Sequence, residues 1–265
     1  MKTCSWMLAA IAASLSVPVP AIVIRHDVPD RQYRAREASF PAVFALYVNR
    51  AGHKDCVATL IAPQWAVTAA HCTRDAPFTQ AMAQARPRHR VEIAGRAAFV
   101  DRVVRHPASE RREGGSFRHW VDLALVHLSR PVRDVTPLRL HRADDEQGLT
   151  VWLPGWGTTG TGMAGLAAPD GRFRLAQNRV SGVQGGWLFW RFDDPSSGAA
   201  LPLEGVSGPG DSGGPALVRR GGRYEILGIS SSQQSGGRPE GTYGVIEGYV
   251  RVSQFAAWIN EVARR

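Results

Sequence analysis

The chain has 265 residues, of which 44% are hydrophobic, so it is long and apolar enough to bury a sizeable core and is not intrinsically disordered. Its formal net charge is +9, but the basic residues are scattered along the chain, with no nucleic-acid-binding motif and no aromatic stacking platform beside them. We therefore expect a basic, solvated surface and no nucleic-acid partner.

The first 21 residues have the pattern of a secretory signal peptide. Lys2 precedes an apolar run that ends at Val17, and small residues lead to a predicted cleavage point after Ala21. The run is too short for a comfortable membrane span, and no later segment reaches about 18 apolar residues. The sequence thus predicts a mature chain of residues 22–265, without a membrane span, in an extracellular or periplasmic location.

The next stretch, residues 25–37, is polar, and we expect it to form an extended arm. Beyond it, short runs rich in Val, Ile and aromatic residues alternate with turn residues, without a regular βαβ pattern, which is typical of a β-sandwich or β-barrel. These predicted strands cover residues 42–48, 56–62, 65–70, 90–94, 98–104, 122–128, 150–156, 186–192, 215–218, 224–230 and 243–252.

Three further segments fall between or after these strands. A boundary between two halves of the fold is expected near residues 129–146, and the Gly-, Ala- and Pro-rich stretches 157–171 and 193–208 are expected to be surface loops. At the C-terminus, residues 253–265 show helical spacing of apolar residues, with Ser253 as the expected N-cap. The apolar residues at this spacing are Phe255, Trp258, Ile259 and Val262.

Two cysteines remain once the signal peptide, with Cys4, is removed. In an oxidising compartment the pair Cys56 and Cys72 is expected to form a disulfide, the alternative being two buried free thiols. His71 adjoins Cys72, but no further cysteine or paired histidine follows at ligand spacing. The sequence therefore predicts no metal site and no cofactor.

Ser212 lies in the glycine-rich stretch GVSGPGDSGGPALV, residues 205–218. Such a composition fits a surface turn. It also fits a nucleophile whose surrounding N–H groups face developing negative charge, but a serine hydroxyl then needs an imidazole base and an orienting acid. His71, at the end of an apolar strand after Ala70, and Asp122, at the head of another, are the candidates for these two roles.

In chain order, the motifs TAAHC, DLALVHL and GDSGGP resemble the three signatures of the chymotrypsin-like (trypsin-like) serine proteases. The likeness extends over most of the mature chain, through the strand FPAVFALYV, the segment WLPGWGTTG and the C-terminal YVRVSQFAAWI. The resemblance implies an all-β fold of two six-stranded antiparallel β-barrels packed together, with a C-terminal α-helix.

The resemblance also implies a function and a set of roles. His71 would act as general base and then acid, Asp122 would orient it, and Ser212 would be the nucleophile. The N–H groups of Gly210 and Ser212 would form the oxyanion hole. The chain would be a secreted serine endopeptidase that cuts protein or peptide substrates through an acyl-enzyme; the alternative is a catalytically silent binding or adhesion protein on the same fold.

The sequence departs from the family at its N-terminus. The usual Ile-Val-Gly-Gly does not stand at its expected place ahead of Ser39. Signal cleavage would instead expose Ile22, whose amine would pair with Asp211, as the family's activated N-terminus does. The arm also resembles secreted bacterial relatives of glutamyl endopeptidase, which activate differently.

The expected substrate pocket departs from the family as well. The position at its base is Val206, so the aspartate with which trypsin prefers Lys or Arg is missing. Ser207, Ser231 and Ser232 are expected to line the pocket, with Ser231 near the orienting acid. Glu247 either enters the pocket from the opposite wall and favours a basic residue, or is an acid on a surface strand.

Overall fold

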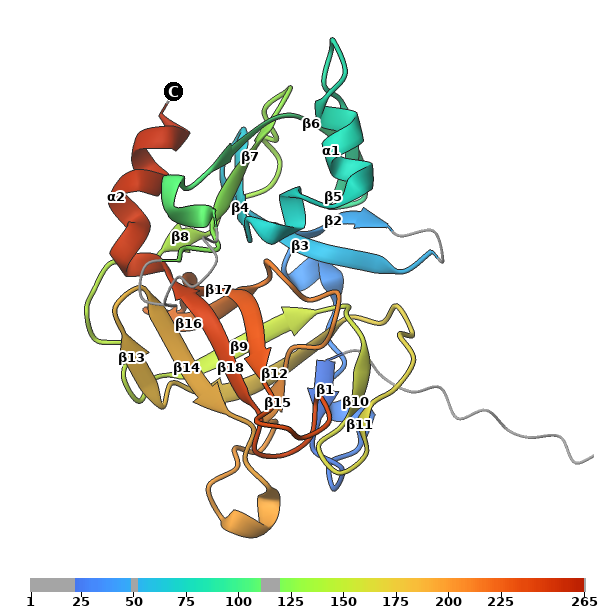
Figure 1. Ribbon diagram of the computed structural model, residues 1–265, viewed down its shortest axis with the longest axis vertical. Helices are drawn as coiled ribbons and strands as arrows, with labels where there is room; N and C mark the ends of the chain where they lie inside the picture. Colours follow the sequence, from blue (N-terminus) through green and yellow to red (C-terminus); the bar gives the residue numbers. More distant parts are fainter. Residues whose placement is uncertain (1–21, 49–51, 111–119, 265) are drawn as a thin grey trace, which may run out of the picture.

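The computed structural model describes residues 22–48, 52–110 and 120–264. It is mostly β, with two barrel-like sheets and a C-terminal helix, which confirms the predicted fold class (Figure 1). Each of the predicted apolar runs contributes a strand. The predicted signal peptide, residues 1–21, lies outside the described residues.

The N-terminal half forms a six-stranded antiparallel sheet that nearly closes on itself. Its strands lie in the order β2-β3-β4-β7-β6-β5, and each neighbouring pair is antiparallel. Alternating side chains of these strands fill the interior, as in any small barrel. The strands are β2 (Val43–Val48), β3 (Lys54–Ala62), β4 (Trp65–Thr68), β5 (His89–Ile93), β6 (Arg96–Arg105) and β7 (Ala124–Leu128).

The C-terminal half forms an eight-stranded sheet in the order β12-β9-β16-β17-β18-β14-β13, with β8 paired in parallel to β17. Bulges interrupt the pairing of β17 with both of its antiparallel neighbours. The strands are β8 (Arg139–Leu140), β9 (Thr150–Gly155), β12 (Arg174–Arg179), β13 (Gly182–Gln184), β14 (Trp187–Arg191), β16 (Pro215–Arg220), β17 (Arg223–Gln234) and β18 (Ile246–Arg251).

A third, four-stranded sheet was not predicted. It consists of β11 (Gly165–Leu166), β10 (Thr159–Thr161), β1 (Ile22–Ile24) and β15 (Gly205–Val206), in that order. All three residues of β1 are buried, although it is the first segment that the structure describes. β1 runs parallel to β10 and antiparallel to β15. The sheet therefore ties the predicted start of the mature chain to the segment leading to Ser212.

The expectation of an extended arm over residues 25–37 is wrong. This stretch contains the 3₁₀ turn η1 (Asp30–Gln32) and leads into a second, η2 (Glu37–Ser39), and the side chain of Tyr33 is almost completely buried. The Tyr33 hydroxyl accepts from the Arg25 N–H and donates to the Glu204 carbonyl oxygen. The polar arm folds back because a buried aromatic ring and its hydroxyl both find partners on the C-terminal half.

The C-terminal helix is confirmed as α2 (Val252–Ala263), and one short helix, α1 (Ala76–Met82), was not predicted. Ser253 does not cap α2. The helix begins one residue earlier, and the Ser253 hydroxyl donates instead to Glu146, a buried carboxylate that also pairs with Arg251. The remaining turns are η3 (His71–Thr73), η4 (Pro107–Ser109) and η6 (Pro195–Ser197).

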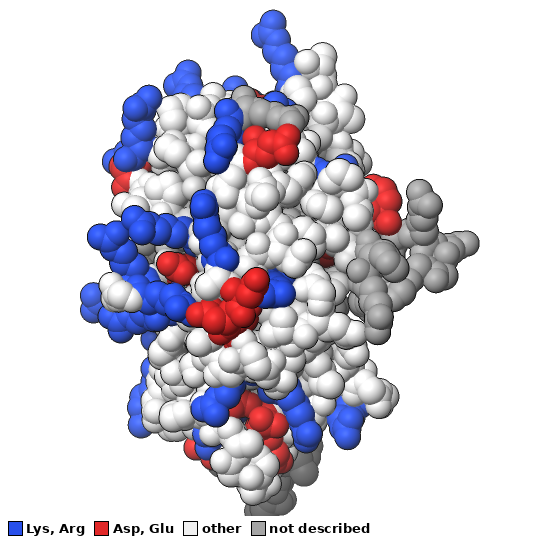
Figure 2. All heavy atoms as spheres, turned by 90° about the vertical axis from the view of Figure 1, so that its left-hand side faces the viewer, with Lys and Arg blue, Asp and Glu red and all other residues white. Residues whose placement is uncertain are grey.

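Basic side chains are spread over the surface. On the face that Figure 2 shows, Lys and Arg occur from top to bottom and acidic residues lie among them. Many arginines in the described part of the chain are paired, for example Arg251 with Asp144 and Glu146. Within the same residues, no helix combines the length and the apolar character that crossing a bilayer requires.

Candidate active site

His71 lies just after the end of β4 in the N-terminal sheet. β4 stops at Thr68, two buried alanines follow, and His71 begins the 3₁₀ turn η3. Its backbone N–H donates to Asp122 Oδ1 at 2.9 Å, and its ring Nδ1 lies 2.6 Å from Asp122 Oδ2. The carboxylate therefore holds both the backbone and the ring through Nδ1, and Nε2 lies on the opposite side of the imidazole.

Asp122 is completely buried just before β7, so its charge depends on these hydrogen bonds. A third donor is the Ser231 hydroxyl, 2.6 Å from Oδ2, as the sequence predicted for Ser231. Burial raises the pKa of Asp122, but the bonds from His71 and Ser231 outweigh it and hold that pKa below its usual value. For His71, burial lowers the pKa, and the bond to Asp122 outweighs it and raises the pKa. The pair is thus an ionised carboxylate that stabilises an imidazolium.

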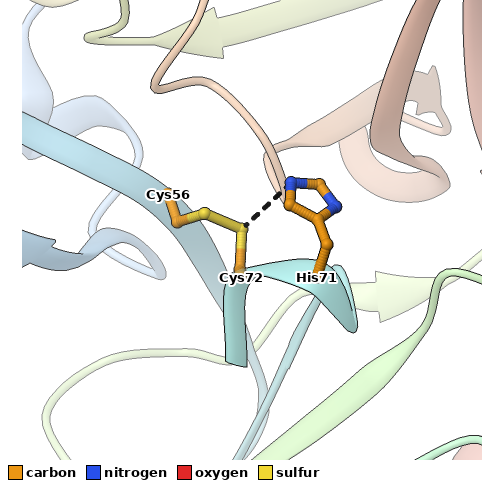
Figure 3. A group of neighbouring side chains, drawn as sticks. All are labelled: Cys56, His71 and Cys72. Atoms are coloured by element: carbon orange, nitrogen blue, oxygen red, sulfur yellow. Dashed lines mark hydrogen bonds between the residues drawn. A yellow bond between two sulfur atoms is a disulfide. The ribbon is translucent and has the colours of Figure 1, made fainter. Parts of the chain in front are cut away.

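The predicted disulfide between Cys56 and Cys72 is confirmed, and the interpretation as free thiols is wrong. Figure 3 shows His71 beside it, with Nε2 lying 3.7 Å from Cys72 Sγ. The three residues lie close enough to suggest a metal site, but both sulfurs are already bonded to each other and offer no thiolate ligand.

The loop that carries Ser212 is held between the two large sheets. The Ser212 carbonyl oxygen accepts from the Val57 N–H in β3 at 2.7 Å, and the Gly213 N–H donates to the Ser230 carbonyl oxygen in β17 at 2.8 Å. Cys72 Sγ lies 3.5 Å from the same Ser212 oxygen. The structure thus brings Ser212 next to the histidine segment from a point 140 residues further along the chain.

The Ser212 hydroxyl and His71 Nε2 share no hydrogen bond; both residues belong to the part of the chain that the structure describes. This bond is often long in a free enzyme and tightens when substrate binds. Of the three residues, the structure therefore joins His71 and Asp122 by hydrogen bonds, and it holds the Ser212 backbone beside Cys72, the neighbour of His71.

Two glycines explain why the Ser212 loop is so rich in this residue. Gly213 has φ +78°, and a Cβ there would lie 2.3 Å from Thr68 Oγ1 and 2.4 Å from the Val57 carbonyl oxygen. Gly210 has φ +100°, a conformation that other residues rarely adopt. Within the described residues, neither the Gly210 nor the Ser212 N–H donates to a protein acceptor. An ordinary surface turn does not explain two such donors beside a held serine.

Asp211 is buried directly beside this loop. Its carboxylate accepts from the N–H groups of Gly157 at 2.7 Å and Gly208 at 3.0 Å. Burial raises its pKa to about 7, against the effect of these bonds. It forms no ion pair with any side chain in the described residues. A Cβ on Gly155 would lie within 3.0 Å of both Ile22 Cδ1 and Asp211 Oδ1, so the Ile22 side chain lies close to this carboxylate.

The cavity beside Ser212 has a volume of about 190 Å³. Four of the predicted pocket residues line it: Ser207, Ser231, Ser232 and Glu247. Val206 does not. Its apolar side chain is wholly buried in the hydrophobic core, where β15 pairs with β1, so it packs away from the cavity.

Glu247 lies inside the cavity wall with an exposed fraction of 1%, so the interpretation as a surface acid is wrong. Its carboxylate accepts from the Ser207 N–H at 2.9 Å and from the Ser207 hydroxyl at 2.8 Å. Burial raises the pKa of Glu247 to about 7, partly offset by these bonds. The pocket therefore contains a buried carboxylate without a cationic partner among the described residues.

The exposed Glu240 and the loop residues Gly208 and Pro209 also line this cavity, and none of them was predicted; nor were Ser230 and Gln233. Ser230 bonds to Ser207, hydroxyl to hydroxyl, at 3.2 Å. Gln233 reaches Glu247 with its amide nitrogen at 3.3 Å. Both lie in the polar end of β17, in the stretch GISSSQQ, but a bulge between Ser230 and Ser232 decides which of these side chains face the cavity. Polarity in a strand that continues a buried apolar run was the only available indication.

Comparison with known proteins agrees with this geometry. Residues 30–259 match the sequence model of a family described as Trypsin. A similar solved structure is that of neuropsin, a serine protease expressed in the limbic system of mouse brain. It shares 19% sequence identity and has a TM-score of 0.62, with 87% of this chain and 98% of that chain covered. At this identity the structural match supports the fold alone.

Proposed function

We propose that this chain, which belongs to the trypsin family and is a serine endopeptidase, hydrolyses peptide bonds through an acyl-enzyme on Ser212. His71 is the general base and acid, and Asp122 orients it. The observation that carries this proposal is the 2.6 Å contact between His71 Nδ1 and the buried Asp122. The N–H groups of Gly210 and Ser212, which donate to no protein acceptor within the described residues, add to it.

In the proposed mechanism, Ser212 Oγ attacks the substrate carbonyl carbon while its proton passes to His71 Nε2. The N–H groups of Gly210 and Ser212 bind the resulting oxyanion. The carbon–nitrogen bond then breaks, and His71 gives its proton to the leaving amine. A water molecule, deprotonated by His71, cleaves the ester and regenerates Ser212. Asp122 stabilises the imidazolium in both steps and keeps its own charge.

A serine-directed fluorophosphonate tests this assignment, because it forms a bond from phosphorus to the reactive serine oxygen as fluoride leaves. We expect labelling of the mature protein, and none in Ser212→Ala. A folded protein that remains unlabelled would contradict the proposal and support a catalytically silent binding protein.

We further infer that the protein is secreted, that residues 1–21 direct its export, and that their removal activates it. The new amine of Ile22 would enter the buried site of Asp211 and pair with its carboxylate, which has only backbone N–H partners in the described residues. The supporting observation is that Ile22 is already buried in β1 and lies beside Gly155, as Asp211 does. N-terminal sequencing of active, secreted protein that begins elsewhere than Ile22 would contradict this.

The pocket chemistry supports a preference for a basic residue on the amino side of the cleaved bond. The buried carboxylate of Glu247 supplies the negative charge that trypsin obtains from an aspartate at the position of Val206. A likeness to glutamyl endopeptidase relatives would instead require a cation for an acidic side chain, and no Lys, Arg or His lines the cavity within the described residues. Cleavage after acidic residues would contradict this part of the proposal.

A further inference from the structure

One side chain of the cavity lining, Gln233, contacts both the buried carboxylate and a neighbouring loop. Gln233 Oε1 accepts from the Gly241 N–H at 2.8 Å, and Gln233 Nε2 lies 3.3 Å from Glu247 Oε1 and 3.4 Å from the Ser207 carbonyl oxygen. Gln233 and Glu247 are also direct partners across β17 and β18. The carboxamide therefore lies in the cavity lining, directly against the buried carboxylate.

The two ends of this carboxamide are held unequally. The bond from Gly241 has the length of a good N–H···O hydrogen bond, whereas both contacts of Nε2 are longer than the usual 2.9–3.0 Å or so. The oxygen end thus fixes the carboxamide, while the long contact of Nε2 satisfies Glu247 only weakly. A cation that enters can therefore become the main donor to Glu247 while the Gln233 side chain stays in place.

The remaining space suits a narrow cationic group. The cavity holds only about 190 Å³, and its polar lining consists mainly of hydroxyl groups and carboxylates. A lysine ammonium is compact and donates in three directions, so it can reach Glu247 and the acceptors of Ser207 together. An arginine guanidinium is a wide planar fork that needs a flat, open approach to the carboxylate.

We propose that Gln233 is a specificity-determining residue that narrows the pocket, so that the enzyme cleaves after lysine in preference to arginine. This inference rests on the proposed function and on Glu247 as the acceptor. Gln233 sets the width of the pocket, Glu247 sets the charge that it accepts, and the Gly241 N–H keeps the carboxamide in place.

The test compares two peptide substrates that differ only in lysine or arginine before the cleaved bond. We expect kcat/KM of the wild type to be at least tenfold higher for lysine, and Gln233→Gly to bring the ratio within threefold by raising the value for arginine. Gln233→Leu keeps the bulk without the hydrogen bonds and should retain the preference for lysine. Gln233→Ala serves if the glycine variant does not fold.

Gln234→Gly is the matched control, because Gln234 is the same residue type, one position on in β17, and exposed. It should leave the ratio unchanged. Gln233→Gly or Gln233→Ala with the wild-type ratio would overturn the role of Gln233, and a wild type that prefers arginine would overturn the predicted preference.

Fluorophosphonate labelling of every variant separates this inference from the proposed function, because the reagent reacts with the serine without needing a basic side chain. Labelled protein that cleaves after neither lysine nor arginine overturns the pocket inference alone. Wild-type protein that is folded but unlabelled overturns the proposed function itself.

Discussion

Asp122 accepts hydrogen bonds from three donors of the candidate active site. It is fully buried, and its two oxygens receive the His71 N–H, the His71 ring and the Ser231 hydroxyl. Three donors on one carboxylate fix the ring's tautomer as well as its orientation. The sequence predicted the residue and its role, but not that one carboxylate would bind both the backbone and the ring of the same histidine.

We expect Asp122→Asn to lower kcat by roughly 10⁴-fold while leaving the fold intact, because the amide favours the wrong imidazole tautomer. Steady-state kinetics with a peptide substrate and circular dichroism check the two parts. Ser231→Ala, which removes only one of the three donors, is the control and should cost far less. A kcat for Asp122→Asn within tenfold of wild type would contradict the orienting role.

Protonation of two groups near the reaction, His71 and Glu247, should make activity depend steeply on pH. The pKa of His71 is raised above its usual value and that of Glu247 is raised to about 7. Below these values the base is protonated and the pocket loses its negative charge. For a lysine substrate we therefore expect kcat/KM to fall on the acid side with a slope approaching two protons.

Glu247→Gln removes one of these titrations and should reduce the acid-side slope toward one, with a large loss of activity toward basic substrates at pH 8. The pH profile of kcat/KM measures both effects. An uncharged substrate should show a slope near one in wild type and variant alike. Unchanged preference and slope in Glu247→Gln would show that Glu247 does not bind the substrate.

At the scale of elements, α2 joins the end of the chain to the N-terminal sheet. Its buried residues include Ile259, and the rings of Phe255 and Trp258 lie 5.2 and 4.9 Å from that of His106, beside η4. Because α2 follows β18 directly, this contact connects the C-terminal sheet to the N-terminal half. The helix α2 thus connects the two halves of the fold.

Ile259→Ala should lower the free energy of unfolding by about 2–5 kcal/mol, since it removes a fully buried side chain and leaves a cavity. Denaturant unfolding followed by tryptophan fluorescence measures this. Gln254→Ala, at an exposed position of the same helix, should stay within about 0.5 kcal/mol of wild type. An equal effect of the two variants would mean that α2 does not pack as the structure has it.

β12 shows why some elements escaped prediction. Its inward-facing residues are Arg174, Ala176 and Asn178, which give no apolar alternation. Arg174 is tolerated in the interior because Asp30 and Asp170 pair with it, and Asn178 because it donates to the Gly205 carbonyl oxygen. Asp170 lies only four residues before Arg174, but Asp30 and Gly205 come from other parts of the chain, so the pattern within the strand does not reveal it.

At the scale of the whole molecule, buried carboxylates couple stability to pH. The folded-state pKa values of Asp211 and Glu247 are raised to about 7, above their values in an unfolded chain. Between the unfolded and folded pKa values the folded protein binds more protons. Their contribution to stability is therefore fully present at acid pH and is lost as pH rises through about 7. The lowered pKa values of His89 and His106 act in the opposite direction.

We expect Ser212→Ala protein that retains residues 1–21, and so has no free Ile22 amine to pair with Asp211, to have a higher Tm at pH 5.5 than at pH 8.5. Adding Asp211→Asn should reduce this difference, because it removes one of the two carboxylates. Differential scanning calorimetry measures both, and each 1 kcal/mol corresponds to roughly 2–4 °C at this size. If Asp211→Asn leaves the difference in Tm between the two pH values unchanged, the carboxylate of Asp211 is either exposed or already paired with a cation in this form.

The sequence by itself determined the strand pattern, the C-terminal helix and the three segments that bear His71, Asp122 and Ser212. Local composition suffices for these, because alternating burial, helical spacing and the glycines of a tight loop act over a few residues. The disulfide also followed from counting cysteines. These features depend on short stretches of chain, and the structure has the strands, the helix and the disulfide as predicted.

Only the tertiary structure decided what surrounds Ser212. Strand pairing and a bulge in β17 decide that Glu247 is buried in the cavity wall, that Gln233 contacts it, and that Val206 faces the core instead. Ile22 lies near Asp211 because an unpredicted sheet pairs β1 with β15. A shift of register by one residue turns every side chain of a strand to its other face. Residue types along the chain therefore indicated the chemistry, whereas long-range pairing set the shape and charge of the pocket.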